Sequence, residues 1–157
     1  MLKWLKSRFV VPKPSGPPQV VRTFASNQPT LTQSGIQVEN GAWQIDASAQ
    51  EKTIRLFEVE NPAVEQCLLS YRADLKAEGL QGRAFLEMWC RLPGRGEFFS
   101  KGYQQAVSGT VNWARYEITF YLKRNQKPDL IKLNVVVEGP GTVWLRDVEL
   151  LKTPLAS

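Results

Sequence analysis

From about residue 36 onward the sequence consists of short runs in which apolar and polar residues alternate, and turn-forming residues separate these runs every ten or so positions. Alternation with a period of two is typical of strands that bury one face. No segment after residue 12 has a helical period. We predict strands over 42–47, 52–59, 66–77, 83–92, 115–123, 130–138 and 142–151. The fold class is therefore all-β, a β-sandwich of the jelly-roll type.

The alternation also predicts which side chains face the core. In the strand 66–77 we expect the odd-numbered residues to point inward, and in 83–92 the even-numbered ones. The stretch "EGLQG" at 78–82 predicts a tight connection between these two strands. We expect Cys67 and Cys90 on the core face, as two buried thiols or, alternatively, as one disulfide between neighbouring strands.

The charge of the chain is concentrated at its beginning. Residues 1–38 contain five basic residues and no acidic one, whereas residues 39–157 contain fifteen of each sign, so the net charge of +5 belongs to the first segment. We therefore divide the chain into a basic, Pro-rich N-terminal tail, 1–38, and a β-sandwich domain, 39–157. A neutral body does not favour nucleic acid as a partner.

The start of the tail, "MLKWLKSRFVV", predicts a short basic amphipathic helix, and "PKPSGPP" after it predicts an extended spacer. The expected helix is a candidate for contact with a protein partner or with a membrane surface, through Lys3, Trp4, Lys6, Arg8 and Phe9. A solvated tail is the plainer alternative. We expect a cytoplasmic or peripheral membrane location, or a mitochondrial one if the segment ending in "VVRTFAS" is a presequence.

Catalysis is not expected. The chain has no histidine, which excludes Ser-His-Asp and Cys-His arrangements and HExxH zinc sites. Glu58 and Glu60 lie two positions apart on one strand, roughly 7 Å by strand rise, a spacing compatible with glycoside hydrolysis. A solvated strand edge is the preferred interpretation of this pair. We predict no enzyme and no cofactor.

A candidate ligand face lies on the outward side of 83–92. Trp89 offers a flat ring, and we expect Arg72 and Glu87 beside it if 66–77 and 83–92 pair. Phe98, Phe99 and Tyr103, in the expected loop "GEFFSKGY", are candidates for its rim. The C–H groups of a sugar stack on an aromatic ring while its hydroxyls bind charged groups. The alternative is that a neighbouring loop or the tail covers Trp89.

The last strand supports a family resemblance. In "EGPGTVWLRDVELL" a Gly-Pro-Gly turn precedes a strand whose alternation shifts phase at Arg146-Asp147, which predicts a β-bulge. Together with "LSYRADLKAEGLQGRAFLEMW", "SGTVNWARYEITFYL" and "DLIKLNVVVEGPG", this strand resembles the galactose-binding-domain-like jelly rolls, the fold of many carbohydrate-binding modules. In that family an Asp-Asp pair often helps to hold calcium. Here Arg146 replaces the first Asp, so we predict no metal site.

Two functions follow from these observations. The first is a non-catalytic accessory subunit that docks, through its tail and sandwich surface, onto a larger protein assembly, with a membrane-associated assembly as one alternative. The second is a carbohydrate-binding module that uses the face around Trp89. The separate basic tail and the few cysteines favour the first, and the resemblance favours the second.

Overall fold

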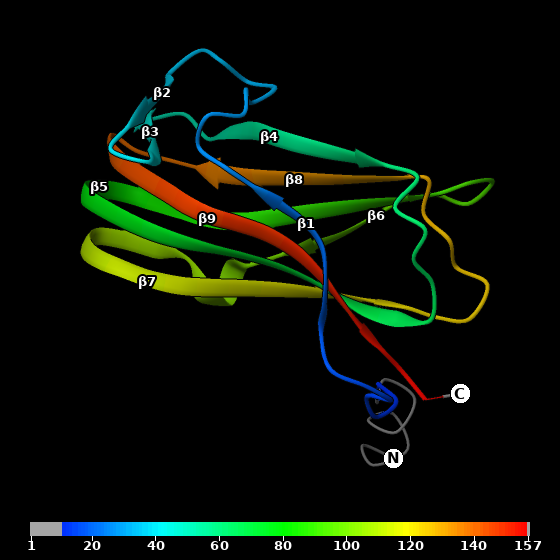
Figure 1. The fold of residues 1–157 in the computed structure, drawn as a ribbon. Helices are drawn as coiled ribbons and strands as arrows, with labels where there is room; N and C mark the ends of the chain where they lie inside the picture. Colours follow the sequence, from blue (N-terminus) through cyan, green and yellow to red (C-terminus); the bar gives the residue numbers. More distant parts are fainter. Residues whose placement is uncertain (1–10, 157) are drawn as a thin grey trace, which may run out of the picture.

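The computed structural model describes residues 11–156, and this part of the chain is all-β (Figure 1). A single turn of 3₁₀-helix, η1 (Tyr103–Gln105), lies among the strands. The strands are β1 (Gln19–Phe24), β2 (Ile36–Glu39), β3 (Ala42–Ala47), β4 (Lys52–Glu60), β5 (Cys67–Leu92), β6 (Gly96–Lys101), β7 (Val107–Leu122), β8 (Leu130–Val137) and β9 (Gly141–Pro154). Within residues 11–156 no helix is long and apolar enough to cross a bilayer.

The strands form two antiparallel layers that share β5. The first layer has the order β2-β3-β9-β5-β7, and β1 pairs with the second half of β9. The second layer has the order β4-β8-β5-β6. The all-β sandwich predicted from the sequence is confirmed.

β5 supplies one arm to each layer. Residues 67–78 pair with β9, whereas residues 84–91 pair with β8. The chain bends between the arms, and both arms leave this bend in Figure 1. The predicted connection at 78–82 is therefore present, but the two strands do not pair with each other. The inward side chains of the two arms pack across the core, and the backbone of each arm forms its hydrogen bonds with other strands.

The core contains the inward sets expected from the alternation. The odd-numbered residues Cys67 to Leu75 and the even-numbered residues Ala84 to Cys90 are buried. Phe85 and Glu87, which point outward from the second layer, are buried as well. Their burial shows that the outer face of this layer is partly covered by its own side chains.

Three strands were not predicted. β1 and β2 fall within residues expected to form tail and linker, so the folded domain starts well before residue 39. Most of their side chains are exposed. β1 lacks the apolar–polar alternation that indicates a strand, and β2 alternates but is only four residues long. Residues 13–15 also join the domain, since the Ser15 amide donates to the Pro154 carbonyl at 2.8 Å. β6 lies in a segment expected to be a loop.

The Gly-Pro-Gly turn before β9 packs against the β5 bend. The Gln81 amide donates to the Pro140 carbonyl at 2.9 Å. A Cβ on Gly139 would lie 2.6 Å from the Ala47 carbonyl oxygen, and one on Gly141 would lie 2.5 Å from the Leu80 Cα. Glycine is required here because two backbone segments approach too closely for a side chain.

Candidate functional site

Three aromatic rings gather on the outer face of the second layer. Trp89 on β5 is paired in register with Phe99 on β6, and their ring centroids are 5.1 Å apart. Tyr103, in η1, packs on Phe85 at 4.9 Å. Phe99 and Tyr103 are 52% and 49% exposed, while Trp89 is half-buried. We call Trp89, Phe99 and Tyr103 the aromatic platform.

Lys101 lies at the centre of the aromatic platform. Its Nζ is 5.8, 4.7 and 6.0 Å from the ring centroids of Trp89, Phe99 and Tyr103, within reach of cation–π attraction. Desolvation lowers the pKa of Lys101, but the charge of Glu87 and the contact with Tyr103 outweigh it, so the pKa is raised overall. Lys101 therefore remains a cation through the neutral pH range.

A buried carboxylate anchors this cation. Glu87 is 4% exposed, and its Oε2 is 3.5 Å from Lys101 Nζ. Its Oε1 accepts a hydrogen bond of 2.9 Å from Asn134 Nδ2 on β8. Because both carboxylate oxygens have partners, Glu87 holds Lys101 in place rather than offering a free charge.

More polar groups surround the platform. Lys132 on β8 is paired in register with Trp89 and forms an ion pair of 2.8 Å with Glu97 on β6. The guanidinium of Arg83 lies over Tyr103, with Cζ 5.3 Å from the ring centroid. This combination of flat rings with donors and acceptors at their edge suits a ligand with an apolar face and many hydroxyl groups.

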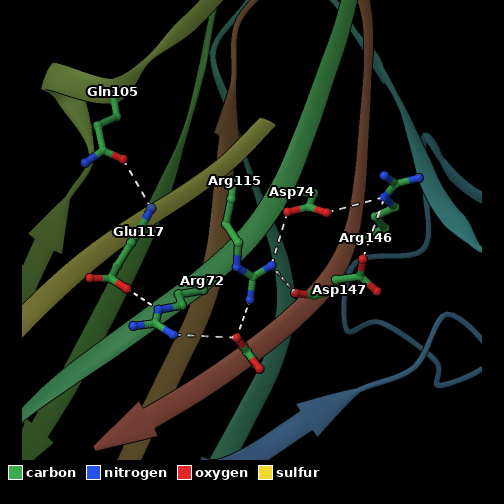
Figure 2. Close-up of polar contacts among 8 residues, drawn as sticks. Arg72, Asp74, Gln105, Arg115, Glu117, Arg146 and Asp147 are labelled. Atoms are coloured by element: carbon green, nitrogen blue, oxygen red, sulfur yellow. Dashed lines mark hydrogen bonds and ion pairs between the residues drawn. The ribbon is translucent and has the colours of Figure 1, made fainter. Parts of the chain in front are cut away.

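The structure brings Glu87, Trp89 and Tyr103 together but places Arg72 on the opposite side of the sandwich. Arg72 belongs to the first arm of β5, which lies in the first layer and does not pair with the second arm. Its side chain points outward from the first layer. Figure 2 shows it in a network with Glu117 on β7 and with a carboxylate of β9, Glu149, whose Oε1 is 4.0 Å from Arg72 Nη1. Arg72 therefore takes no part in the platform.

The rest of this network is made of alternating charges (Figure 2). Asp74 lies 3.1 Å from Arg115 and 3.4 Å from Arg146, and Arg115 also pairs with Glu149. The Gln105 side chain accepts a hydrogen bond from the Glu117 amide at 3.2 Å. Since its charged groups are largely paired with one another, this face offers few free groups for a ligand.

The bulge predicted at Arg146-Asp147 is confirmed. The register of β5 against β9 shifts between Arg72 and Asp74, and Asp147 has a φ of 53°. The Arg146 guanidinium, the residue that differs from the family pattern, stacks over Trp113 at 4.0 Å. Among residues 11–156 no group of three or more His, Cys, Asp or Glu side chains is arranged to hold a metal ion.

The other candidate residues have ordinary surroundings or lie outside the described part. Glu58 forms an ion pair of 3.0 Å with the neighbouring Arg55. Cys67 and Cys90 are free thiols, and burial raises their pKa to about 11 and about 12. The tail residues Lys3, Trp4, Lys6, Arg8 and Phe9 lie outside the described residues.

The sequence analysis missed Lys101, and it placed Phe99 at the rim of the ligand face but in a loop rather than a strand. "EFFSK" has no apolar–polar alternation that would indicate a strand. Once the segment is treated as a strand, its period of two places Glu97, Phe99 and Lys101 on one face. Phe98 then belongs to the other face, opposite Cys90. It therefore does not extend the platform.

No family model matches this chain, and no curated protein matches it. Solved structures do. The CBM22-1 xylan-binding domain from Paenibacillus barcinonensis Xyn10C matches with a TM-score of 0.53 and 10% identity, over 88% of this chain and 97% of that one. A structure described as "CBM4 structure and function" matches with a TM-score of 0.49 and 14% identity over 76% of both chains.

A third match is CBM29_1, a family 29 carbohydrate-binding module from Piromyces equi, with a TM-score of 0.47 and 14% identity, over 88% of this chain and 91% of that one. At such identities the likeness concerns the fold alone. The chain has the β-sandwich jelly-roll fold expected from its sequence, and it shares this fold with the CBM22-1 domain.

Proposed function

We propose that this protein is a non-catalytic carbohydrate-binding module and that the aromatic platform is its binding face. The observation that carries the proposal is the grouping of Trp89, Phe99 and Tyr103 around one cation, with two of the rings about half exposed. One solved structure of similar fold is described as a xylan-binding domain. The fold makes this class of ligand plausible, and the platform supplies the chemistry.

The chemistry of the platform favours a sugar over an apolar protein surface. The carbon-bound hydrogens of a pyranose ring pack on an indole or phenyl face. Lys101 and the pair Lys132–Glu97 lie beside the rings, and charged groups form strong hydrogen bonds with hydroxyls. An apolar protein partner would remove water from these groups without offering them hydrogen bonds in exchange, which carries a desolvation cost.

The platform also favours binding without catalysis. Glu87 is the buried carboxylate nearest the rings, and both of its oxygens are already bound, by Lys101 and by Asn134. A general acid or a nucleophile requires a carboxylate that can reach the scissile bond. We therefore retain the expectation that the chain needs no cofactor and catalyses no reaction.

The accessory-subunit hypothesis stays a prediction. It depends mainly on the tail residues, which the structure does not describe. A module of this kind can still deliver a partner to a glycan, so tail docking and sugar binding are compatible.

The experiment that tests the proposed function is a screen of the full chain against insoluble and soluble polysaccharides: xylan, cellulose, β-glucan, mannan, galactan, chitin and pectin. We expect saturable retention on at least one of them and loss of this retention in Trp89→Ala. If the chain is retained on none of the polysaccharides while its fold is intact, the proposed function is wrong.

A further inference from the structure

A cavity with no residue in common with the aromatic platform lies in the first layer, between residues 26–33 and the hairpin β2–β3. Its volume is about 310 Å³, at the small end of the range for ligand sites. Such a volume suits one small ring rather than an extended chain. The cavity and the platform belong to different layers of the sandwich, so a ligand in one does not occupy the other.

The polar part of the cavity is made of neutral groups. It contains amide side chains, among them Asn27, Gln33 and Gln37, and no charged residue. None of these three side chains forms a hydrogen bond to another residue within 11–156, whereas the side-chain Oε1 of Gln28 accepts one from the Ala25 backbone amide. Each free amide offers two donors and an acceptor. The cavity therefore suits a ligand whose groups both donate and accept.

The apolar part of the cavity includes Ile36, Val38 and Trp43. Val38 is 56% exposed, which leaves an apolar side chain in water. Trp43 is 2% exposed, and its Nε1 is the buried side-chain donor without a hydrogen-bond acceptor in the described part of the chain. A buried donor without an acceptor costs about 1–3 kcal/mol. Trp43 therefore borders the cavity mainly as an apolar wall.

We infer that this cavity is a second binding site, which takes a single neutral sugar unit. The absence of charged side chains from its lining disfavours ions, because an ion would lose its hydration without gaining a counter-charge. A purely apolar ligand would leave the amides unpaired. A neutral pyranose has an apolar face for Ile36 and Val38 and hydroxyl groups for the amides.

The test is a titration of the full-length, isotope-labelled chain followed by NMR. The probes are the methyl glycosides of glucose, galactose, mannose and xylose, with glucuronate and glucosamine as charged counterparts. We expect at least one neutral glycoside to shift the side-chain amide signals of Asn27 and Gln37 and the indole signal of Trp43 in a saturable way. We expect at least tenfold weaker effects from both charged sugars.

Two matched variants assign the effect to the cavity. Gln37→Leu keeps the size of the side chain and removes its amide, so the saturable shifts should be lost. Gln44→Leu, on β3 opposite Gln37 in register and not part of the cavity lining, should keep them. Trp89→Ala should also keep them, which separates this site from the proposed function. The inference is overturned if no neutral glycoside gives saturable shifts, if charged sugars bind equally, or if Gln37→Leu binds like the unmodified chain.

Discussion

The rings of Trp89 and Phe99 lie 5.1 Å apart across the β5–β6 pair, at an interplanar angle of 57°. Tilted rings do not form one flat surface, so they present two faces in different directions. Lys101, two residues after Phe99 on the same face of β6, extends its Nζ to within 5.8 Å of both ring centroids. The two tilted rings therefore share one cation, Lys101.

Lys101→Met should destabilise the fold, because it leaves the carboxylate of Glu87 buried without its cation. Breaking a fully buried pair costs about 3–5 kcal/mol. Lys101 retains 23% of its side-chain exposure and Asn134 still binds Glu87, so we expect about 1–3 kcal/mol. Urea unfolding measures the change.

The control for this change is Lys76→Met. Lys76 lies 5.0 Å from the Trp144 ring centroid on the opposite face, and no carboxylate partner of Lys76 is present among the described residues. Its loss should cost no more than about 1 kcal/mol. The double variant Lys101→Met, Glu87→Gln should regain part of the stability. If Lys101→Met is no less stable than Lys76→Met, Lys101 does not neutralise Glu87.

The sequence predicted well which side chains face the core, because alternation reports burial. The inward sets of both β5 arms and the bulge at Arg146-Asp147 were read from side-chain period alone. The pairing partners of the arms could not be predicted in this way, because hydrogen bonding between strands depends on contacts between residues far apart in the chain. The error in pairing is what placed Arg72 beside Trp89.

The candidate site was predicted in part. Trp89, Glu87 and Tyr103 converge, but the expected loop at the rim is the edge strand β6. Edge strands expose both faces, so their pattern is weak, as in β1, whose residues Gln19 to Arg22 are mostly exposed. The cavity beside Trp43 could not be predicted, because residues 26–33 carry no regular pattern.

Gly139→Ala should destabilise the fold by at least about 2 kcal/mol. The added Cβ would lie 2.6 Å from the Ala47 carbonyl oxygen, and this atom belongs to the backbone of β3 and cannot move away alone. Thermal unfolding followed by circular dichroism measures the effect. Gly16→Ala is the control, since its Cβ would meet a Pro154 side-chain atom at an ordinary 3.4 Å. Equal stability of the two variants would refute the close approach of the turn and β3.

The pKa of Asp129 should lie below the usual value for an aspartate. Arg91 donates to both of its carboxylate oxygens, at 2.8 and 3.3 Å, and these hydrogen bonds and the positive charge lower that pKa. The folded form thus holds this proton less tightly than the unfolded chain. The stabilisation is present above about pH 4 and is lost as the pH falls through the folded pKa.

A chemical-shift titration of the Asp129 side chain checks this assignment. The inflection should lie at a higher pH in Arg91→Gln than in the unmodified chain. An unchanged inflection would show that Arg91 does not bind Asp129 in solution.

Cys67 and Cys90 should resist thiol reagents in the folded protein. Burial raises their pKa to about 11 and about 12, so the reactive thiolate is scarce at pH 8. We expect Ellman's reagent to label neither thiol in buffer and both in concentrated urea. Because the folded pKa values are raised, the contribution of the two thiols to the stability of the fold is complete below about pH 9 and declines as the pH rises above it. Rapid labelling of the folded chain would contradict their burial.

The central claim is that the aromatic platform binds carbohydrate. Affinity electrophoresis tests it most directly, in gels that contain a polysaccharide on which the chain was retained in the screen. Three proteins are compared: the unmodified chain, Trp89→Ala, and Trp113→Ala on the opposite face of the sandwich. Our account predicts that the polysaccharide slows the unmodified chain and Trp113→Ala equally, and that Trp89→Ala binds at least about tenfold more weakly, a loss of about 1.4 kcal/mol or more. If the polysaccharide slows Trp89→Ala as much as the unmodified chain but no longer slows Trp113→Ala, binding lies on the opposite face and the account is contradicted.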